Sequence, residues 1–454
     1  MKILIPVFVL VLTGCVSAPD VSPIPELVQN PTAAQPRRAP NAGWWTLLAD
    51  DKLNQLMQLG LSGSPTNRAA AARVVQAEAG LKVARAARWP VLTAVASREA
   101  QNVSGAGDSR ADLGSLGLTW DAGLWGKRRL QIDAAREFLN ERWFEHQSVQ
   151  LTLSALIAET YFQIVEQKLQ SALLADQLKV SIDLERLIEE RFRRGQARAN
   201  EVYQQREATQ GLQQLKIIVD TQLTALEIGL DALLGQAPDA VSRVNVVIVP
   251  ITPVLDETGT PEQLIRHRPD LRASFARLRQ TAAAAGISIV ERLPTLEVTA
   301  NLTSLAQKTM SAEWFGHGLN LTAPIFSGGR LRGLQAQAFQ RLEEERQNYH
   351  AVWLTAMEEV ATLTWQYSQQ QAVIAAVEQR REFAQLALDA AQNRYVRGDQ
   401  NYLDVLTALR GLQEADRLLI AERMLLVALW VQAMEAAGQR MCGNSADCEQ
   451  HWRI

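Results

Sequence analysis

Residues 191–195 read Arg-Phe-Arg-Arg-Gly and are followed by Glu201-Val202. The pattern returns at residues 394–398, which read Arg-Tyr-Val-Arg-Gly and are followed by Asp404-Val405, a constant distance of 203 positions (195 to 398, 201 to 404). Other residues recur at the same distance: Leu116, Leu118 and Thr119 as Leu319, Leu321 and Thr322, and Gly126-Lys127 as Gly329-Arg330. The 454-residue chain is therefore predicted to contain two copies of one unit.

Each repeated stretch closes a long segment that contains no proline. These segments, 127–193 and 330–397, are rich in Ala, Leu, Glu, Gln and Arg, which favour helices. A helix of this length spans on the order of 100 Å, which is typical of a coiled coil rather than a globular core. Gly195 and Gly398 then predict helix C-caps, from which a second helix returns.

Before each long helix the sequence predicts a β-hairpin. Shorter helices end before Pro90 and Pro294, and proline favours an extended chain there. In the second copy, apolar residues at 296, 298, 300 and 302 alternate with polar residues at 297, 299, 301 and 303, which is the period of a strand. We expect return strands at 113–124 and 319–326, the second after a Gly-rich loop at 316–318.

These strands suit a membrane-spanning β-barrel. Their length of about ten residues matches the ~9–11 that cross a bilayer, and a two-faced strand is stable there only in a closed barrel. Two hairpins supply four strands, whereas bacterial barrels begin at about eight. The sequence therefore predicts an oligomer, and three copies would give twelve strands. The aromatic residues near the strand ends fit interfacial girdles, while Trp89 and Trp125 fit ordinary helix–strand packing equally well.

The N-terminus predicts a processed lipoprotein. Lys2 precedes a nine-residue apolar run, which is too short for a transmembrane helix. Leu12-Thr13-Gly14-Cys15 follows and resembles the lipobox of bacterial lipoproteins, in which the cysteine is lipidated. Val16 follows instead of Asp, which in that family points to the outer membrane. The alternative is an ordinary secretory signal that contains a cysteine.

Composition excludes several classes of function. A net charge of −3 and a pI near 6.1 argue against a nucleic-acid partner. Five scattered histidines and seven unclustered methionines predict no metal site. Cys442 and Cys448 lie in a short Gly/Asn/Ser segment, where an oxidising periplasm favours a disulfide over two free thiols. We expect no cofactor.

Several motifs occur in a fixed order that resembles one family. They are Trp44-Trp45, Leu124-Trp125-Gly126-Lys127, Arg268-Pro269-Asp270, the stretch 324–330 (Pro-Ile-Phe-Ser-Gly-Gly-Arg) and the two Arg-aromatic-x-x-Gly turns. Together with the lipobox and the duplication they resemble the outer membrane factor (TolC-like) family, in its lipoprotein efflux-channel branch. One departure is Phe275, where this family commonly has Glu.

The resemblance implies an α+β membrane protein. Three chains would share a 12-stranded β-barrel that continues into a long periplasmic α-helical barrel. The chain would be a passive exit duct of a tripartite efflux system rather than an enzyme, partnered by a periplasmic adaptor, an inner-membrane pump and outer-membrane lipids. The alternative is a non-porous periplasmic scaffold or adaptor lipoprotein, which has no use for a lipid-facing strand.

The duplication also predicts the domain boundaries. We expect the following segments: signal peptide 1–14; lipidated tether 15–43; first repeat 44–235 with a hairpin at 90–124; linker 236–260; second repeat 261–438 with a hairpin at 294–326; and C-terminal tail 439–454.

The two helical turns are the expected functional positions. The resemblance places Arg191, Gly195, Glu201, Arg394 and Gly398 at the periplasmic tips that meet the adaptor. It places Tyr395, Gln400 and Asp404 at the aperture, where any latch would be a hydrogen bond because Gln400 replaces an arginine found in some members. Two roles fit Asp404: a ring of three carboxylates that narrows the aperture, or a capping box closed with Asn401.

Overall fold

The computed structural model describes residues 16–21, 43–103, 107–239, 243–244, 267–307 and 310–438. The predicted lipidation site Cys15, the Cys442–Cys448 pair and most of the linker lie outside these residues and stay predictions. The chain divides into two compact units. One comprises residues up to 29, 72–144 and 270–352, and the other comprises 30–71, 145–269 and 353–454.

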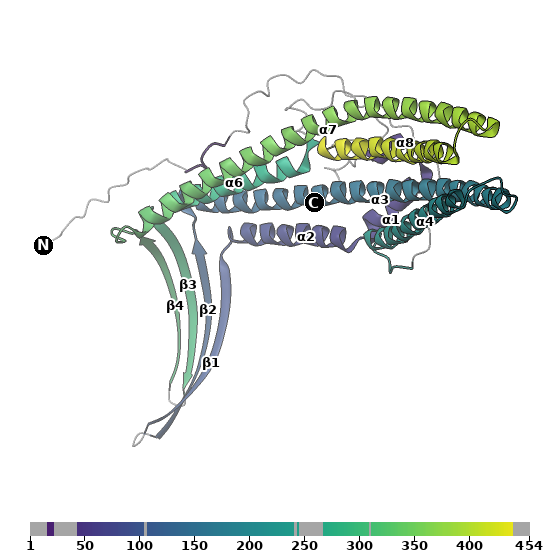
Figure 1. Ribbon diagram of the computed structural model, residues 1–454. Coiled ribbons are helices and arrows are strands. Elements are labelled where there is room, and N and C mark those ends of the chain that lie inside the picture. Colours follow the sequence, from purple (N-terminus) through teal and green to yellow (C-terminus); the bar gives the residue numbers. More distant parts are fainter. Residues whose placement is uncertain are drawn as a thin grey trace. The chain divides into compact units, whose positions relative to one another are not determined.

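The first unit contains one antiparallel sheet of four strands in the order β1-β2-β3-β4 (Figure 1). The strands are β1 (Val91–Val103), β2 (Gly107–Asp121), β3 (Thr295–Gln307) and β4 (Met310–Thr322). Each repeat supplies one hairpin, and β2 pairs with β3 to join the two copies. The predicted hairpins are confirmed, and β1 and β4 form the edges of the sheet.

The predicted loop at 316–318 is wrong, because these residues belong to β4. Gly316 pairs with Asn301 and Gly318 with Thr299. A Cβ atom at Gly316 would lie 2.5 Å from the Asn301 side chain, and one at Gly318 would lie 3.1 Å from Thr299 Oγ1. The glycines therefore leave room for polar side chains on the neighbouring strand. The strand also ends at Thr322, before the predicted end at Phe326.

Two shorter helices lead into the hairpins, and two longer ones follow them. α2 (Pro65–Ala86) precedes β1 and α6 (Pro269–Val290) precedes β3. α3 (Lys127–Arg193) and α7 (Arg330–Arg397) have the predicted bounds. α4 (Ala199–Leu233) and α8 (Tyr402–Ala436) return from them as helical hairpins, as Figure 1 shows. No helix in the described part of the chain is both long and apolar enough to cross a membrane.

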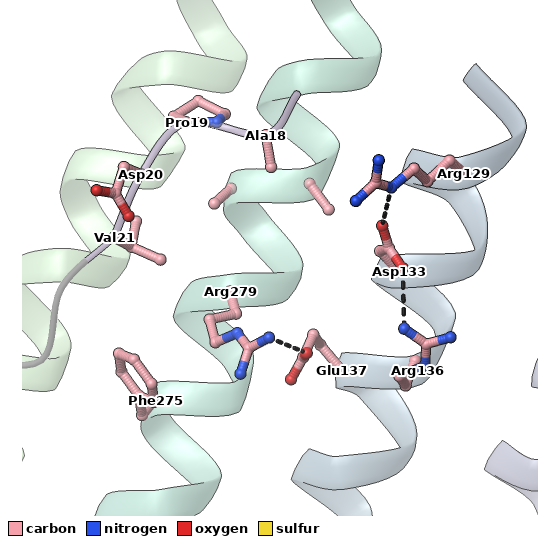
Figure 2. A pocket seen from close by; sticks show the side chains of 12 residues that line it. Ala18, Pro19, Asp20, Val21, Arg129, Asp133, Arg136, Glu137, Phe275 and Arg279 are labelled. Carbon is pink, nitrogen blue, oxygen red and sulfur yellow. Dashed lines mark hydrogen bonds and ion pairs between the residues drawn. The ribbon is translucent and has the colours of Figure 1, made fainter. Parts of the chain in front are cut away.

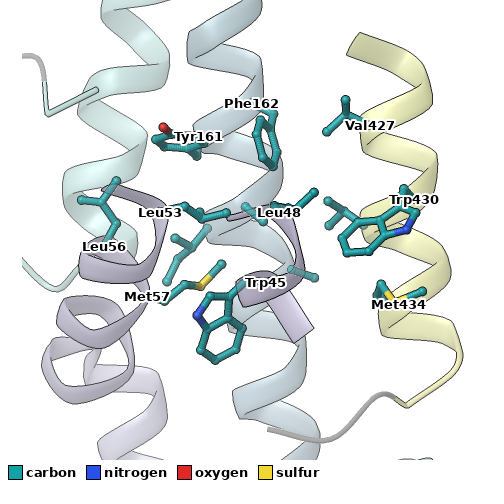
Figure 3. Packing of buried hydrophobic residues seen from close by; sticks show 14 of the residues in the cluster. Trp45, Leu48, Leu53, Leu56, Met57, Tyr161, Phe162, Val427, Trp430 and Met434 are labelled. Carbon is teal, nitrogen blue, oxygen red and sulfur yellow. The ribbon is translucent and has the colours of Figure 1, made fainter. Parts of the chain in front are cut away.

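The main hydrophobic core belongs to the second unit. It joins η1 (Trp44–Leu48) and α1 (Asp51–Gly63) to α3, α4 and α8 (Figure 3). Trp44 and Trp430 are each 1% exposed and their ring centroids lie 5.9 Å apart. Asp50 caps α1 through its carboxylate, which also accepts a 2.6 Å hydrogen bond from the Tyr161 hydroxyl. The Trp44-Trp45 motif thus forms part of this core.

The Arg268-Pro269-Asp270 motif ties the second repeat together. Arg268 is largely buried and donates to the Glu359 carboxylate at 2.7 Å and to the Ala436 carbonyl at 2.9 Å. Its guanidinium therefore satisfies a carbonyl at the C-terminus of α8 and binds α7 at the same time.

Phe275 changes the surroundings of a buried tyrosine in the first unit. Its ring packs against Tyr349 on α7, with centroids 5.6 Å apart. The Tyr349 hydroxyl is buried with no hydrogen-bond partner among the described residues, and burial raises the pKa of Tyr349. The family that the sequence resembles commonly has Glu at position 275. A carboxylate there would be a hydrogen-bond acceptor, which phenylalanine is not.

Tyr349→Phe is expected to stabilise the protein by about 1 kcal/mol, because it removes a buried donor that forms no hydrogen bond. The measurement is the unfolding temperature of the purified protein in detergent. Tyr161→Phe is the matched control, since its hydroxyl bonds Asp50, and it should lower that temperature. A lower unfolding temperature for Tyr349→Phe would show that the hydroxyl has a partner in solution.

Candidate functional site: the turns between the long helices

Both turns at the ends of the long helices are Schellman motifs, as the glycines predict. In the first copy the amide of Gln196 donates to the Arg191 carbonyl at 2.8 Å, and that of Gly195 to the Phe192 carbonyl at 2.9 Å. Asp399 and Gly398 repeat these bonds in the second copy, both at 3.0 Å. Gly195 and Gly398 have φ values of 69° and 82°, the left-handed region that favours glycine. The duplicated motif is therefore a duplicated backbone turn.

A small hydrophobic cluster lies directly behind the turns. It draws on both helical hairpins and consists of Ile188, Val202, Leu388, Ala391, Tyr402, Val405, Leu406 and Leu412. The first helical residue of α8, Tyr402, is 2% exposed. The cluster thus holds the start of α8 against α3 and α4.

The predicted aperture residue Tyr395 lies against both hairpins. The Arg191 guanidinium lies 4.8 Å from the centroid of its ring, a cation–π contact, and the Tyr402 ring lies 5.8 Å away. Burial raises the pKa of Tyr395, the Arg191 charge opposes the shift, and Glu201 adds to it. The structure therefore brings together three residues that the sequence singled out: Arg191, Glu201 and Tyr395.

One hydrogen bond between the hairpins comes from Tyr402, a residue that the sequence motifs did not indicate, while Arg410–Glu207 and Arg417–Gln177 also link α8 to the first hairpin. The Tyr402 hydroxyl donates to Gln205 Oε1, and Gln205 Nε2 donates to the Ser181 carbonyl at 2.8 Å and hydroxyl at 2.9 Å. Ser181 also bonds Thr209. The Tyr395 hydroxyl and Gln400 Oε1 are buried without a hydrogen-bond partner among the described residues. The duplication did contain a signal for Tyr402. The equivalent position in the first copy, 199, is alanine, so the tyrosine is specific to the second copy.

The surroundings of the Tyr402 phenol shift its pKa. Burial is the largest cause that raises the pKa of Tyr402 to about 12, Tyr395 and Glu201 add to the shift, and the charge of Arg410 opposes it. The neutral phenol is the donor in the bond to Gln205. The bond is therefore stable throughout the neutral pH range.

Asp404 and Glu201 do not form capping boxes. The Asp404 amide donates to the backbone carbonyl of Asn401 at 3.2 Å, and the Asn401 side chain makes no capping hydrogen bond. Arg198 likewise offers no side-chain cap to α4. The Asp404 carboxylate is exposed at the start of α8, where its charge suits the helix dipole. Of the two roles predicted for Asp404, the capping box therefore lacks the hydrogen bond that the Asn401 side chain would make.

A groove with several polar residues lies between α3 and α8, and it borders the hydrophobic core through Phe162 and Met424. Ser154, Ile157 and Tyr161 face η1 and α1. By helical spacing, the opposite side of α3 carries the residues of the groove. The groove has a volume of about 370 Å³, and its polar lining residues are Glu159, Gln163, Glu166, Glu422 and Gln432. Burial raises the pKa of Glu166. Within the described ranges no three His, Cys, Asp or Glu side chains gather closely enough to hold a metal ion.

Comparison with known proteins agrees with this architecture. The chain matches the outer membrane efflux protein family over residues 56–236 and 260–439, one match for each copy of the repeat. It is 28% identical to the pyoverdine export outer membrane protein OpmQ of Pseudomonas putida, over 88% of this chain and 90% of that protein. It is 24% identical to the cation efflux system protein CusC of Escherichia coli K12, over 89% and 91%. The structure of the outer membrane protein VceC from Vibrio cholerae superposes with a TM-score of 0.81 at 26% identity, covering 89% of this chain and 100% of that one.

Proposed function

The chain belongs to the outer membrane efflux protein family, and from this membership we propose that three copies form one water-filled exit duct with a gated periplasmic tip. The chain is a passive efflux channel and not an enzyme. It serves in a tripartite system with an adaptor and a pump, and its large helical portion is periplasmic.

The two faces of the sheet carry this proposal. Directly paired residues share a face, so the register divides the side chains into two sets. The largely apolar face holds Leu92, Leu116, Leu118, Trp120, Leu296, Val298, Leu302, Phe315, Leu319 and Leu321, and its charged residues Arg98, Asp112 and Glu313 lie toward the hairpin loops. The more polar face holds Thr93, Ser97, Ser115, Thr119, Glu297, Thr299, Asn301, Thr303 and Asn320, together with the apolar residues Val91, Val95, Leu113, Leu305 and Trp314. Lipid on one side and water on the other account for both sets.

The open edges of the sheet and the exposed apolar helix residues support the oligomer. Among the strands that the structure describes, β1 and β4 each have a neighbour on one side only, and exposed edges are not stable in lipid. Large apolar side chains are also exposed on α4 and α7: Ile217, Ile218, Ile228, Trp365, Phe383 and Leu386. Threefold assembly pairs the edges into twelve strands and covers these helix residues. A non-porous scaffold accounts for neither.

Two further assignments belong to this proposal. Cys15 is lipidated and anchors the chain in the outer membrane, a proposal supported by the sequence Leu12-Thr13-Gly14-Cys15 and by Val16. At the tip, Tyr395, Gln400 and Asp404 line the aperture. The adaptor docks on the surface formed by Arg191, Gly195, Glu201, Arg394 and Gly398, which is supported by the exposure of both glycines and Arg394.

The test is the oligomeric state and conductance of the purified protein. We expect a trimer in detergent and discrete ion-conducting steps in planar bilayers. Asp404→Ala should raise conductance, because it removes three carboxylates that attract and hold cations at the narrowest point. Asp389→Ala is the control, since Asp389 is an exposed carboxylate on α7 away from the turn. A monomer that never conducts would exclude the duct, and unchanged conductance in Asp404→Ala would remove Asp404 from the aperture.

A further inference from the structure

The segment that follows Cys15 is held against the junction between the sheet and α3. This segment, residues 16–21, is called the strap here. The Val16 amide donates to the Trp125 carbonyl at 3.2 Å. A Cβ atom at Gly126 would lie 3.1 Å from the Val16 carbonyl oxygen, and one at Gly286 on α6 would lie 3.3 Å from the Ala18 Cα. Two glycines therefore allow the strap to approach the backbone closely.

The strap continues as an extended chain beside α6 (Figure 2). Ala18 to Val21 form one wall of a cavity of about 550 Å³. The other walls carry paired charges, in which Asp133 bonds Arg136 at 3.1 Å and Glu137 bonds Arg279 at 2.8 Å. The strap thus contacts folded structure along its length instead of leaving the protein at Val16.

The duplicated chain shows that this junction is unusual. Positions 125 and 126 correspond to 328 and 329 in the second copy. The φ values are similar in both, 64° and 82° in the first copy and 58° and 87° in the second. The second copy uses glycine at both positions. The first copy has tryptophan at position 125, one of only two non-glycine residues with positive φ in the described part of the chain.

Trp125 occupies a strained conformation that glycine would adopt freely, and such strain is retained where it serves a purpose. Its indole Nε1 donates to the Pro294 carbonyl at 2.8 Å, immediately before β3 begins. Its own carbonyl accepts the Val16 amide. The side chain therefore fixes the turn to the end of the sheet, while the main chain binds the strap. No neighbouring atom lies within 4 Å of a Cβ built at Gly328 or Gly329.

We propose that the Trp125–Gly126 turn is a docking site for the strap and that it fixes where the lipid anchor leaves the protein. This rests on the proposed lipidation of Cys15. Val16 directly follows Cys15 in the sequence, so docking Val16 at this turn ties the anchored end of the chain to the junction between the sheet and α3. The segment that docks is this chain's own N-terminal segment. The equivalent turn in the second copy, Gly328–Gly329, has no such segment against it in the described part of the chain.

The duplication supplies a matched pair of variants for the test. Gly126→Ala and Gly329→Ala introduce the same side chain at positions with similar φ values, 82° and 87°, but only the first meets the strap. The readout is the rate at which a protease specific for acidic residues cleaves after Asp20 in the full-length trimer. Cleavage follows the population of the released strap, so we expect it to be about fivefold faster in Gly126→Ala than in Gly329→Ala. Equal rates in the two variants would overturn the proposal.

A third variant separates docking from general destabilisation. In this variant Ser17–Val21 is replaced with Gly and Ser residues, which should release the strap. In that background, Gly126→Ala should lower the unfolding temperature only as much as Gly329→Ala does. If the excess effect persists, the strap is not its cause. Acylation is measured separately by incorporation of labelled palmitate. If wild-type protein incorporates no labelled palmitate, the lipid anchor is excluded, while the result on docking of the strap still stands.

Discussion

Replacing Tyr402 with phenylalanine is expected to shift the reconstituted channel toward its open state by at least a hundredfold. The change deletes the hydroxyl that joins α8 to Gln205 on α4 and leaves Gln205 Oε1 buried without a donor. Such a loss costs about 1–3 kcal/mol in each protomer. If the three hairpins of a trimer move together, the costs add, and about 3 kcal/mol or more favours the open state by about two orders of magnitude.

Tyr395→Phe is the control that identifies the latch. The Tyr395 hydroxyl has no partner among the described residues, whereas its ring contacts Arg191 and Tyr402. Phenylalanine keeps the ring, so single-channel recordings should show the open probability of the wild type. If Tyr395→Phe opens the channel and Tyr402→Phe does not, the hydrogen bond described here is not the latch.

The same bond predicts the response of the channel to alkaline pH. An unperturbed tyrosine has a pKa of about 10, and burial raises the pKa of Tyr402 to about 12. A raised pKa means that the folded tip favours the protonated phenol, so its contribution is complete below pH 10 and is lost as the pH rises toward 12. Wild-type open probability should therefore rise across this interval. The open probability of Tyr402→Phe should stay constant over the same pH interval.

The sequence predicted the helices better than the strands, for a physical reason. The approximate bounds predicted for α3 and α7 agree with the structure, because helix-forming residues run without proline up to a glycine that caps the last turn. The start of β4 was predicted poorly, since Gly316 and Gly318 indicate a loop when read alone, whereas the strand begins at Met310. Their purpose becomes visible only when Asn301 and Thr299 lie opposite them, and that pairing depends on tertiary structure.

The candidate site was predicted by its position but not by its bonds. The repeat located both turns, and Tyr395, Arg191 and Glu201 do lie together there. One of the residues that join the hairpins, Tyr402, pairs with a glutamine 197 positions away in the sequence. Nothing in local spacing indicates such a contact. Trp125 is a similar case, because its left-handed backbone and its bond to Val16 follow from the folded junction alone.

Replacing Gly235 with alanine is expected to destabilise the second unit by about 3 kcal/mol or more. Gly235 ends α4 with a φ of 72° and caps it through the bond from its amide to the Ala232 carbonyl. A Cβ atom there would lie 2.5 Å from the Gly63 carbonyl oxygen. The contact is reciprocal, since a Cβ atom at Gly63 would lie 2.4 Å from the Leu234 carbonyl oxygen. The ends of α1 and α4 therefore meet backbone to backbone.

Gly195→Ala is the control that separates the two parts of this cost, the positive φ and the close approach. Gly195 caps α3 in the same motif at a φ of 69°, but no atom lies within 4 Å of a Cβ built there. It should bear only the conformational cost, about 1–2 kcal/mol, and that cost is confined to the tip. The measurement is thermal unfolding of both variants in detergent, with a clearly lower unfolding temperature for Gly235→Ala. Equal losses would mean that α1 shifts freely to admit the methyl group. The core argues against such a shift, because Leu53, Leu56 and Met57 of α1 are each at most 1% exposed and no side-chain rotation can move the Gly63 carbonyl.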